Sequence, residues 1–197
     1  MDMTKKPFKL IMLISAAVFF CCSLAWGAGP TEEQRPFSQQ MGFPVDLTLK
    51  KTEDGYKLIH RPVKEIEKLW KQTYEFGPAV LEPGKNLFEG IEGTAMDIEI
   101  EFEYDPFVYF LNINTPNGAV QCTGIEPAVK ALGQIQFADI GKTMKLRILT
   151  DTDSMEIFGN DGGIYMPFIS KARGSKLSLD VHLPVKLIRA RVSVIGR

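Results

Sequence analysis

Acidic side chains recur at every second position between residues 97 and 103, and they are the first groups in the chain that could carry chemistry. Four carboxylates alternate there with apolar residues: Asp97, Glu99, Glu101 and Glu103. The alternation places them on one face of an extended strand, where they could bind a cation or a sugar. Neighbours on such a face are about 7 Å apart, too far to chelate one ion without help from loops. We therefore interpret the row as a solvated outer face of a sheet.

A second acidic group is Asp151, Asp153 and Ser154, which is similar to a calcium loop but lacks its glycine and distal glutamate. A turn capped by short polar side chains is the favoured interpretation. His60 and His182 have no partner close in the sequence, so no metal site is predicted. The chain has no Ser-His-Asp spacing, nucleophile elbow or phosphate-binding glycine loop. The residues therefore predict no catalytic site and no cofactor.

Three aromatic residues, Trp70, Tyr74 and Phe76, are the candidates for substrate binding. Exposed aromatic rings can stack on the apolar faces of sugars. The alternative is that Trp70 completes the buried stripe of a preceding helix. Both interpretations remain open at this point.

The composition, with 45% hydrophobic and 24% charged residues, is that of a globular protein. Residues 1–27 have the form of a signal peptide: an n-region with three lysines, an apolar run over residues 10–24, and small residues at Ala25 and Gly27. We expect export to the periplasm or the extracellular space. An uncleaved membrane anchor and a lipoprotein modified at Cys21 or Cys22 are the alternatives.

The charge and cysteine content limit the partners and the bonds. Removing residues 1–27 takes three lysines and one aspartate from totals of 23 basic and 24 acidic residues, which leaves 20 and 23. A nucleic-acid partner needs a basic face and is not predicted. Cys122 is the only cysteine beyond the leader, so no intramolecular disulfide is expected.

The first elements after the leader are a flexible N-terminus over residues 28–36, a hairpin and one helix. Alternating residues at 45–49 and 56–59 flank the turn at residues 53–55, which predicts a β-hairpin. The hairpin should fold back on the rest of the chain or stay mobile. Pro62 suits the first position of a helix. Its apolar stripe would be Val63, Ile66, Leu69 and Trp70.

From Ala95 onward the pattern is entirely that of strands. They are expected at residues 95–104, 107–115, 119–123, 135–137, 176–183 and 185–195. Residues 146–168 add three short alternating runs, separated by Asp151-Thr152-Asp153 and by Asn160-Asp161-Gly162-Gly163, which is typical of an antiparallel meander. About nine or ten strands predict an all-β fold, a two-sheet antiparallel sandwich of the jelly-roll or concanavalin-like kind.

The meander also resembles the signature of the C-terminal β-sandwich module of glycoside hydrolase family 32, the fructosidases (invertase, levanase, inulinase). That family typically reads R-I-L-V-D-R-(S/T)-S-(I/V)-E-(I/V)-F-x-N-D-G. The residues that match and form the structural signature here are Arg147, Asp151, Ser154, Glu156, Phe158, Asn160, Asp161 and Gly162. Thr150 and Thr152 depart, because Val and Arg are usual there, so a charge contact made by that Arg is not expected.

The resemblance implies a fold without the chemistry, because the family's catalytic groups lie in a separate propeller domain. Its W-M-N-D-P-N-G, R-D-P and E-C motifs do not occur in this sequence. The resemblance also implies that the hairpin is a remnant of the last propeller blade. The chain then divides into a signal peptide (1–27), a flexible N-terminus with the remnant hairpin (28–61) and the sandwich module (62–197).

Three functions follow as hypotheses. The first is a secreted non-catalytic module that supports or contacts a partner, such as a fructosidase propeller domain or a second copy of itself. The second is a fructan-binding or other carbohydrate-binding protein. The third is a truncated glycoside hydrolase. Hydrolase activity by the chain itself is not expected, since the retaining reaction needs two carboxyl groups about 5–5.5 Å apart in one site.

Overall fold

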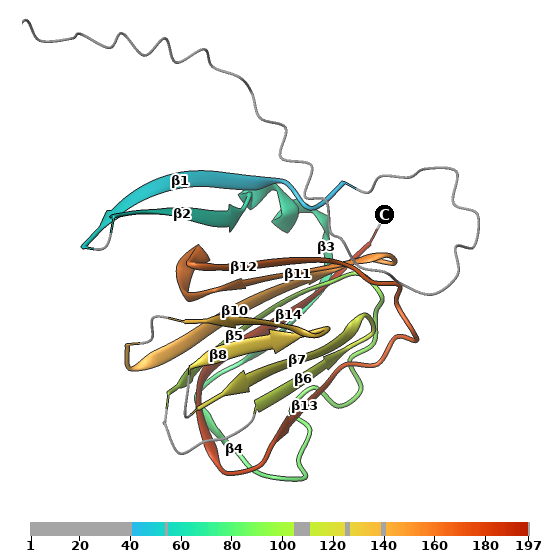
Figure 1. Ribbon diagram of the computed structural model, residues 1–197. Helices are drawn as coiled ribbons and strands as arrows, with labels where there is room; N and C mark the ends of the chain where they lie inside the picture. The colour runs from blue at the N-terminus through green and yellow to red at the C-terminus, as the bar shows by residue number, and fades with distance from the viewer. Residues whose placement is uncertain (1–40, 54, 105–110, 125–126, 139–140, 197) are drawn as a thin grey trace, which may run out of the picture.

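The computed structural model describes residues 41–53, 55–104, 111–124, 127–138 and 141–196, and within them the strands form three antiparallel sheets (Figure 1). A separate hairpin pairs β1 (Val45–Thr52) with β2 (Gly55–Pro62). The large sheet contains β3 (Trp70–Phe76), β4 (Ala79–Leu81), β5 (Met96–Glu103), β10 (Thr143–Thr150), β11 (Ser154–Gly159), β12 (Ile164–Ile169) and β14 (Val185–Ile195). The small sheet contains β6 (Leu111–Thr115), β7 (Gly118–Thr123), β8 (Ala128–Ala131), β9 (Gln134–Phe137) and β13 (Ser178–Val181).

The large and small sheets pack face to face around one apolar core, which confirms the predicted two-sheet sandwich. The order of strands is β12-β11-β10-β5-β14-β3 in the large sheet, with β4 also paired to β14, and β13-β6-β7-β8-β9 in the small sheet. Alternation dictates the core: Met96, Ile98, Ile100 and Phe102 of β5 are all buried on its inner face. Small-sheet residues such as Ile113 and Val120 meet them in the same cluster.

The predicted meander is confirmed, because β10, β11 and β12 are consecutive neighbours in antiparallel register. The first turn is closed by backbone, with the Asp151 N–H donating to the Ser154 carbonyl at 2.9 Å. The second turn is the 3-10 helix η2 (Asn160–Gly162), whose Asn160, Asp161 and Gly162 have φ of 46°, 58° and 95°. These are the left-handed conformations for which Asn, Asp and Gly are suited.

The helix predicted from Pro62 is shorter and tighter than expected. The structure has a 3-10 helix, η1 (Lys64–Leu69), while Pro62 ends β2 and Trp70 begins β3. Of its proposed stripe, Ile66 is buried but Leu69 is 49% exposed. A spacing of three residues fits one turn of 3-10 helix as well as an α-helix, and the chain then turns into the edge strand β3. The strands β3, β4 and β8 were not predicted.

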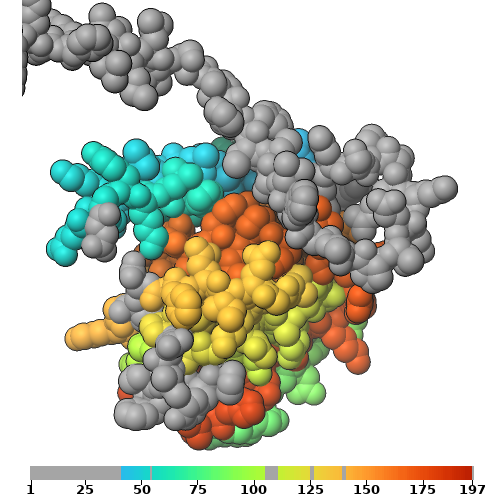
Figure 2. Space-filling model, in the orientation of Figure 1, coloured from blue at the N-terminus to red at the C-terminus, as the bar shows by residue number. Residues whose placement is uncertain are grey.

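The hairpin folds back on the sandwich at its base. Pro44 accepts a hydrogen bond from the Val63 N–H at 3.1 Å, and Phe43, Val45 and Val63 pack with η1 on Leu149 and Phe158 of the large sheet. The meander therefore has apolar residues on both of its faces. The rest of the hairpin extends beyond the sandwich (Figure 2).

Several expectations fall on residues that the structure does not describe: the signal peptide, the flexible N-terminus over residues 28–36, and the first part of the strand expected at 107–115. Among the described residues, no helix has both the length and the apolar character needed to cross a lipid bilayer.

Candidate binding groove

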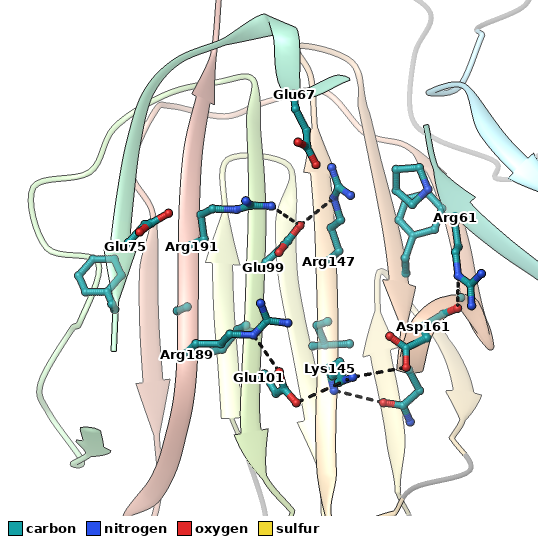
Figure 3. A pocket seen from close by; sticks show the side chains of 18 of the residues that line it. Arg61, Glu67, Glu75, Glu99, Glu101, Lys145, Arg147, Asp161, Arg189 and Arg191 are labelled. Carbon is teal, nitrogen blue, oxygen red and sulfur yellow. Dashed lines mark hydrogen bonds and ion pairs between the residues drawn. The ribbon is translucent and has the colours of Figure 1, made fainter. Parts of the chain in front are cut away.

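A groove of about 610 Å³ lies on the outer face of the large sheet, the face turned away from the small sheet (Figure 3). Its floor is formed by β5, β10 and β14. One wall comes from η1 and β3, and the other from η2 and the end of β2. We call this feature the outer-face groove. Its charged lining residues are Arg61, Lys64, Glu67, Glu75, Glu99, Glu101, Lys145, Arg147, Asp161, Arg189 and Arg191.

The floor of the groove consists of acidic residues of β5 held between basic residues of the two neighbouring strands. Arg189 on β14 contacts Glu101 at 2.9 Å, and Lys145 on β10 lies 3.9 Å from the same carboxylate. Arg191 contacts Glu99 at 2.7 Å and Arg147 lies 3.4 Å from Glu99 on the other side. These pairs, which we call the ion-pair ladder, join residues that the sheet register places directly opposite one another.

Asp97 continues the ladder into the interior, and here the expectation of a solvated face is wrong. Its side chain is only 1% exposed and accepts hydrogen bonds from Arg147 Nε and Nη2 at 2.9 and 2.7 Å. The Trp70 indole N–H donates a third at 3.2 Å. Burial raises the pKa of the Asp97 carboxyl, and the bonds from Arg147 oppose that shift. The buried pair fixes the position of Arg147 at the edge of the groove.

The second wall of the groove depends on the η2 turn. Arg61 Nε donates to the Asp161 carbonyl at 3.1 Å, and Lys145 Nζ lies 3.4 Å from the Asp161 carboxylate. Asn160 Oδ1 accepts the Lys145 N–H at 3.2 Å. A Cβ on Gly162 would lie 2.2 Å from the His60 carbonyl oxygen, so only glycine lets β2 approach this turn so closely.

Glu156 on β11 holds the segment of chain that leads into β1. It is 1% exposed, and its carboxylate accepts the Phe43 N–H at 2.7 Å and the Tyr165 hydroxyl at 3.1 Å. The Tyr165 ring stacks on His60 with the centroids 4.4 Å apart. Burial raises the pKa of Glu156, against the effect of these two donors, and burial lowers the pKa of His60.

The signature residues thus serve the hairpin and the groove. Arg147, Phe158, Asn160, Asp161 and Gly162 all line the outer-face groove, and Glu156 holds the chain that enters β1. Asp151 and Ser154 close the β10–β11 turn instead. Asn117 Nδ2 donates to the Asp151 carbonyl at 2.8 Å and ties this turn to the small sheet.

The three aromatic candidates do not form one surface. Tyr74 and Phe76 are partly buried and pack against the core, and Phe76 also contributes to the lining of the groove. The register between β3 and β14 shifts next to Ile195, the residue paired with Trp70. This β-bulge puts Trp70 on the outer face, where the Arg191 guanidinium lies 4.3 Å from its ring centroid. A planar cation therefore covers a ring that a sugar would need to contact.

The groove can bind polar groups through its paired charges. The carboxylates of Glu99 and Glu101 each lie between an arginine of β14 and a basic residue of β10. No group of three or more His, Cys, Asp or Glu residues in the described ranges is placed to hold a metal ion. Cys122 is buried in the core, and burial raises its thiol pKa to about 12.

Sequence reasoning missed Arg189, Arg191 and Lys145 as site residues. A signal was present, because Arg189 and Arg191 alternate along their strand as the four carboxylates do along residues 97–103. Their complementarity becomes visible only when β5 and β14 are known to be neighbours.

No protein-family model matches the chain. It is 29% identical over 153 residues to a levanase of Bacillus sp. (strain L7), a match that spans 64% of this chain and 16% of the levanase. It is 25% identical over 151 residues to the levanase of Bacillus subtilis (strain 168), spanning 64% of this chain and 22% of that enzyme.

Solved structures share the fold. The exo-inulinase from Aspergillus awamori aligns with a TM-score of 0.64 and 15% identity, over 84% of this chain and 37% of that chain. A fructofuranosidase from Schwanniomyces occidentalis, complexed with fructose, aligns with a TM-score of 0.63 and 12% identity, over 79% and 40%.

The fold and the groove define the described chain as an antiparallel β-sandwich with an attached hairpin and a charged outer face. The levanase similarity and the shared fold support its resemblance to the C-terminal β-sandwich module of the glycoside hydrolase family 32 fructosidases. The chain spans only 16% and 22% of the two levanases.

Proposed function

We propose that this chain is an exported, non-catalytic module that holds a partner protein against the outer-face groove, and that the partner is a fructosidase propeller domain. The observation that carries the proposal is the groove itself. It is walled on one side by the hairpin and η2 and floored by a prearranged ion-pair ladder. Fixed, alternating charges favour recognition of one complementary surface over others.

The direct test is binding to a separately expressed fructosidase propeller domain, measured by calorimetry. Arg189→Glu places like charge next to Glu101 at a site where the arginine side chain is 64% exposed, so the fold should survive. We expect binding to weaken by about tenfold or more. Lys85→Glu is the matched control, because Lys85 forms an exposed pair with Glu82 and does not line the groove. Equal binding by both variants, or none by the unaltered chain, would contradict the proposal.

Fructan binding is the second candidate, and the size of the groove favours it. Its volume of about 610 Å³ falls in the range of small-molecule sites, and its arginine and carboxylate groups can form paired hydrogen bonds. Titration with levan and inulin oligomers separates this candidate from protein docking. An absence of heat over the millimolar range would eliminate it.

Two simpler measurements address the remaining expectations. Hydrolysis of sucrose and levan, assayed with the chain alone and with the added propeller domain, tests whether the chain is a truncated fructosidase. Mass spectrometry of the exported protein tests cleavage after Gly27. We expect no hydrolysis by the chain alone, and a mature N-terminus at Ala28.

A further inference from the structure

The outer edge of β1 is not paired with any strand in the described part of the chain. Its inner edge pairs with β2, and β1 lies on the side of the hairpin away from the sandwich (Figure 1). Positions 46 to 51 are all exposed. A free edge is a template for another strand, and a two-stranded ribbon is marginally stable alone.

The sequence of β1 is complementary to itself when it is reversed about Thr48. In an antiparallel pair of two copies centred there, Leu47 of one copy lies opposite Leu49 of the other, and Asp46 lies opposite Lys50. Twofold symmetry makes each of these pairs twice. Residues directly opposite one another share a face, so the apolar and the charged pairs fall on different faces of the sheet.

Neighbouring registers lose the pairing of opposite charges. Centring the pair on Leu49 places Leu47 opposite Lys51, and Thr48 opposite Lys50. Centring it on Leu47 pairs Leu47 with itself and Leu49 with Val45, but it places Asp46 opposite Thr48 and Lys50 opposite Pro44. Moving the centre by one residue in either direction therefore removes the pairing of Asp46 with Lys50. The alignment about Thr48 is therefore the one that pairs both the leucines and the opposite charges.

The second strand of the hairpin strengthens the same arrangement. Leu58 lies opposite Leu49 within the hairpin, and the two side chains are 46% and 65% exposed. Leu47 is 54% exposed on the same face. Pairing two copies would extend this apolar stripe across four strands, which is enough for a sheet with one hydrophobic face to be stable.

We propose that two copies of this chain associate through antiparallel pairing of their β1 strands about Thr48, which forms a continuous four-stranded sheet. The contact is isologous, as a twofold dimer requires. It uses the edge of the hairpin opposite to the groove, so it goes beyond the proposed function and leaves the groove accessible. The small contact area makes this a weak dimer, with a dissociation constant in about the micromolar range.

The test is a charge exchange followed by sedimentation velocity on the full chain. Asp46→Lys sets lysine against Lys50 twice, and Lys50→Asp sets aspartate against Asp46 twice. We expect each single variant to weaken the dimer by about tenfold or more. The double variant should restore it, and a mixture of the two single variants should form a heterodimer. Lys68→Asp, an exposed change on η1, is the control and should have no effect.

A crosslink tests the register. In a chain with Cys21 and Cys22 changed to Ser, Thr48→Cys should form a disulfide-linked dimer under mild oxidation, since the two introduced residues would face each other. Thr52→Cys, four positions away, should not. The proposal is overturned if the chain stays monomeric up to about 500 μM, if the charge exchange has no effect on the dimer, or if both cysteine variants crosslink equally. Unchanged thermal denaturation of each variant confirms that the fold is intact.

Discussion

The buried pair of Asp97 and Arg147 allows a sharp prediction, because its two members are not equally replaceable. Asp97 is 1% exposed and Arg147 is 18% exposed. Arg147→Ala removes two hydrogen bonds, at 2.9 and 2.7 Å, and leaves the Asp97 carboxylate with the single donor of Trp70 at 3.2 Å. Asp97→Ala leaves Arg147 with Glu99 at 3.4 Å and partial access to water.

Removing one partner of a buried ion pair costs about 3–5 kcal/mol when the other charge is left uncompensated. We expect Arg147→Ala to approach this range and Asp97→Ala to cost less, about 1–3 kcal/mol, because the arginine keeps a second carboxylate. The cost of Arg147→Ala should also shrink in acid. An isolated buried carboxyl takes up a proton more readily in the folded than in the unfolded chain, so the stability of this variant relative to the unaltered chain falls as pH rises.

The assay is urea denaturation of the unaltered chain, the two single variants and the double variant, at neutral pH and at about pH 5. The four proteins form a double-mutant cycle that isolates the coupling of the pair. The reasoning is refuted if Arg147→Ala lies within about 1 kcal/mol of the unaltered chain, or if Asp97→Ala is the more destabilising change.

Three further predictions concern the attachment of the hairpin. Because burial raises the pKa of Glu156, its carboxyl group binds a proton more tightly in the folded chain than in the unfolded chain. The contribution of Glu156 to the free energy of unfolding therefore falls as pH rises through that pKa. Glu156→Gln should remove this slope, while its carbonyl oxygen can still accept the Phe43 N–H and its amide nitrogen can donate to the Tyr165 hydroxyl. An unchanged profile of unfolding free energy against pH would contradict the assignment. Gly162→Ala should cost about 2 kcal/mol or more, because φ is 95° and the new Cβ would meet the His60 carbonyl at 2.2 Å. Gly163→Ala, with φ of −69° and a nearest contact of 3.4 Å, is the control and should change the urea midpoint little. Phe158→Ala, at a 3% exposed position under η1, should lower the free energy of unfolding by about 3–5 kcal/mol and speed proteolysis of the hairpin. Proteolysis as slow as in the unaltered chain would show that the hairpin is held elsewhere.

The parts of the fold that the sequence predicts are those encoded by short-range patterns. The meander follows from strict alternation and from turn residues suited to positive φ, as at Asn160 and Asp161. The type of helix that follows Pro62 was harder to predict, because the spacing of Ile66 and its neighbours fits one 3-10 turn as well as the first turn of an α-helix. The strand that follows was missed because the bulge near Trp70 interrupts its alternation.

The site was less predictable than the fold, for a reason of distance along the chain. The carboxylate row was visible in the sequence, but its partners Arg189 and Arg191 lie 88 and 92 residues away. Local pattern cannot say that β14 will insert beside β5. A strand read alone therefore predicts a solvated acidic face, whereas the assembled sheet neutralises it and buries Asp97.

The bulge between β3 and β14 also changes how this edge of the sheet should tolerate mutation. On the C-terminal side of the bulge, even-numbered residues such as Tyr74 face the interior, whereas Trp70 faces outward. A saturation-mutagenesis scan along β3 should therefore show an alternation of sensitive and tolerant positions that reverses at the bulge. An alignment that matched this strand to a relative without the bulge would assign inward and outward roles to the wrong residues at one of its ends.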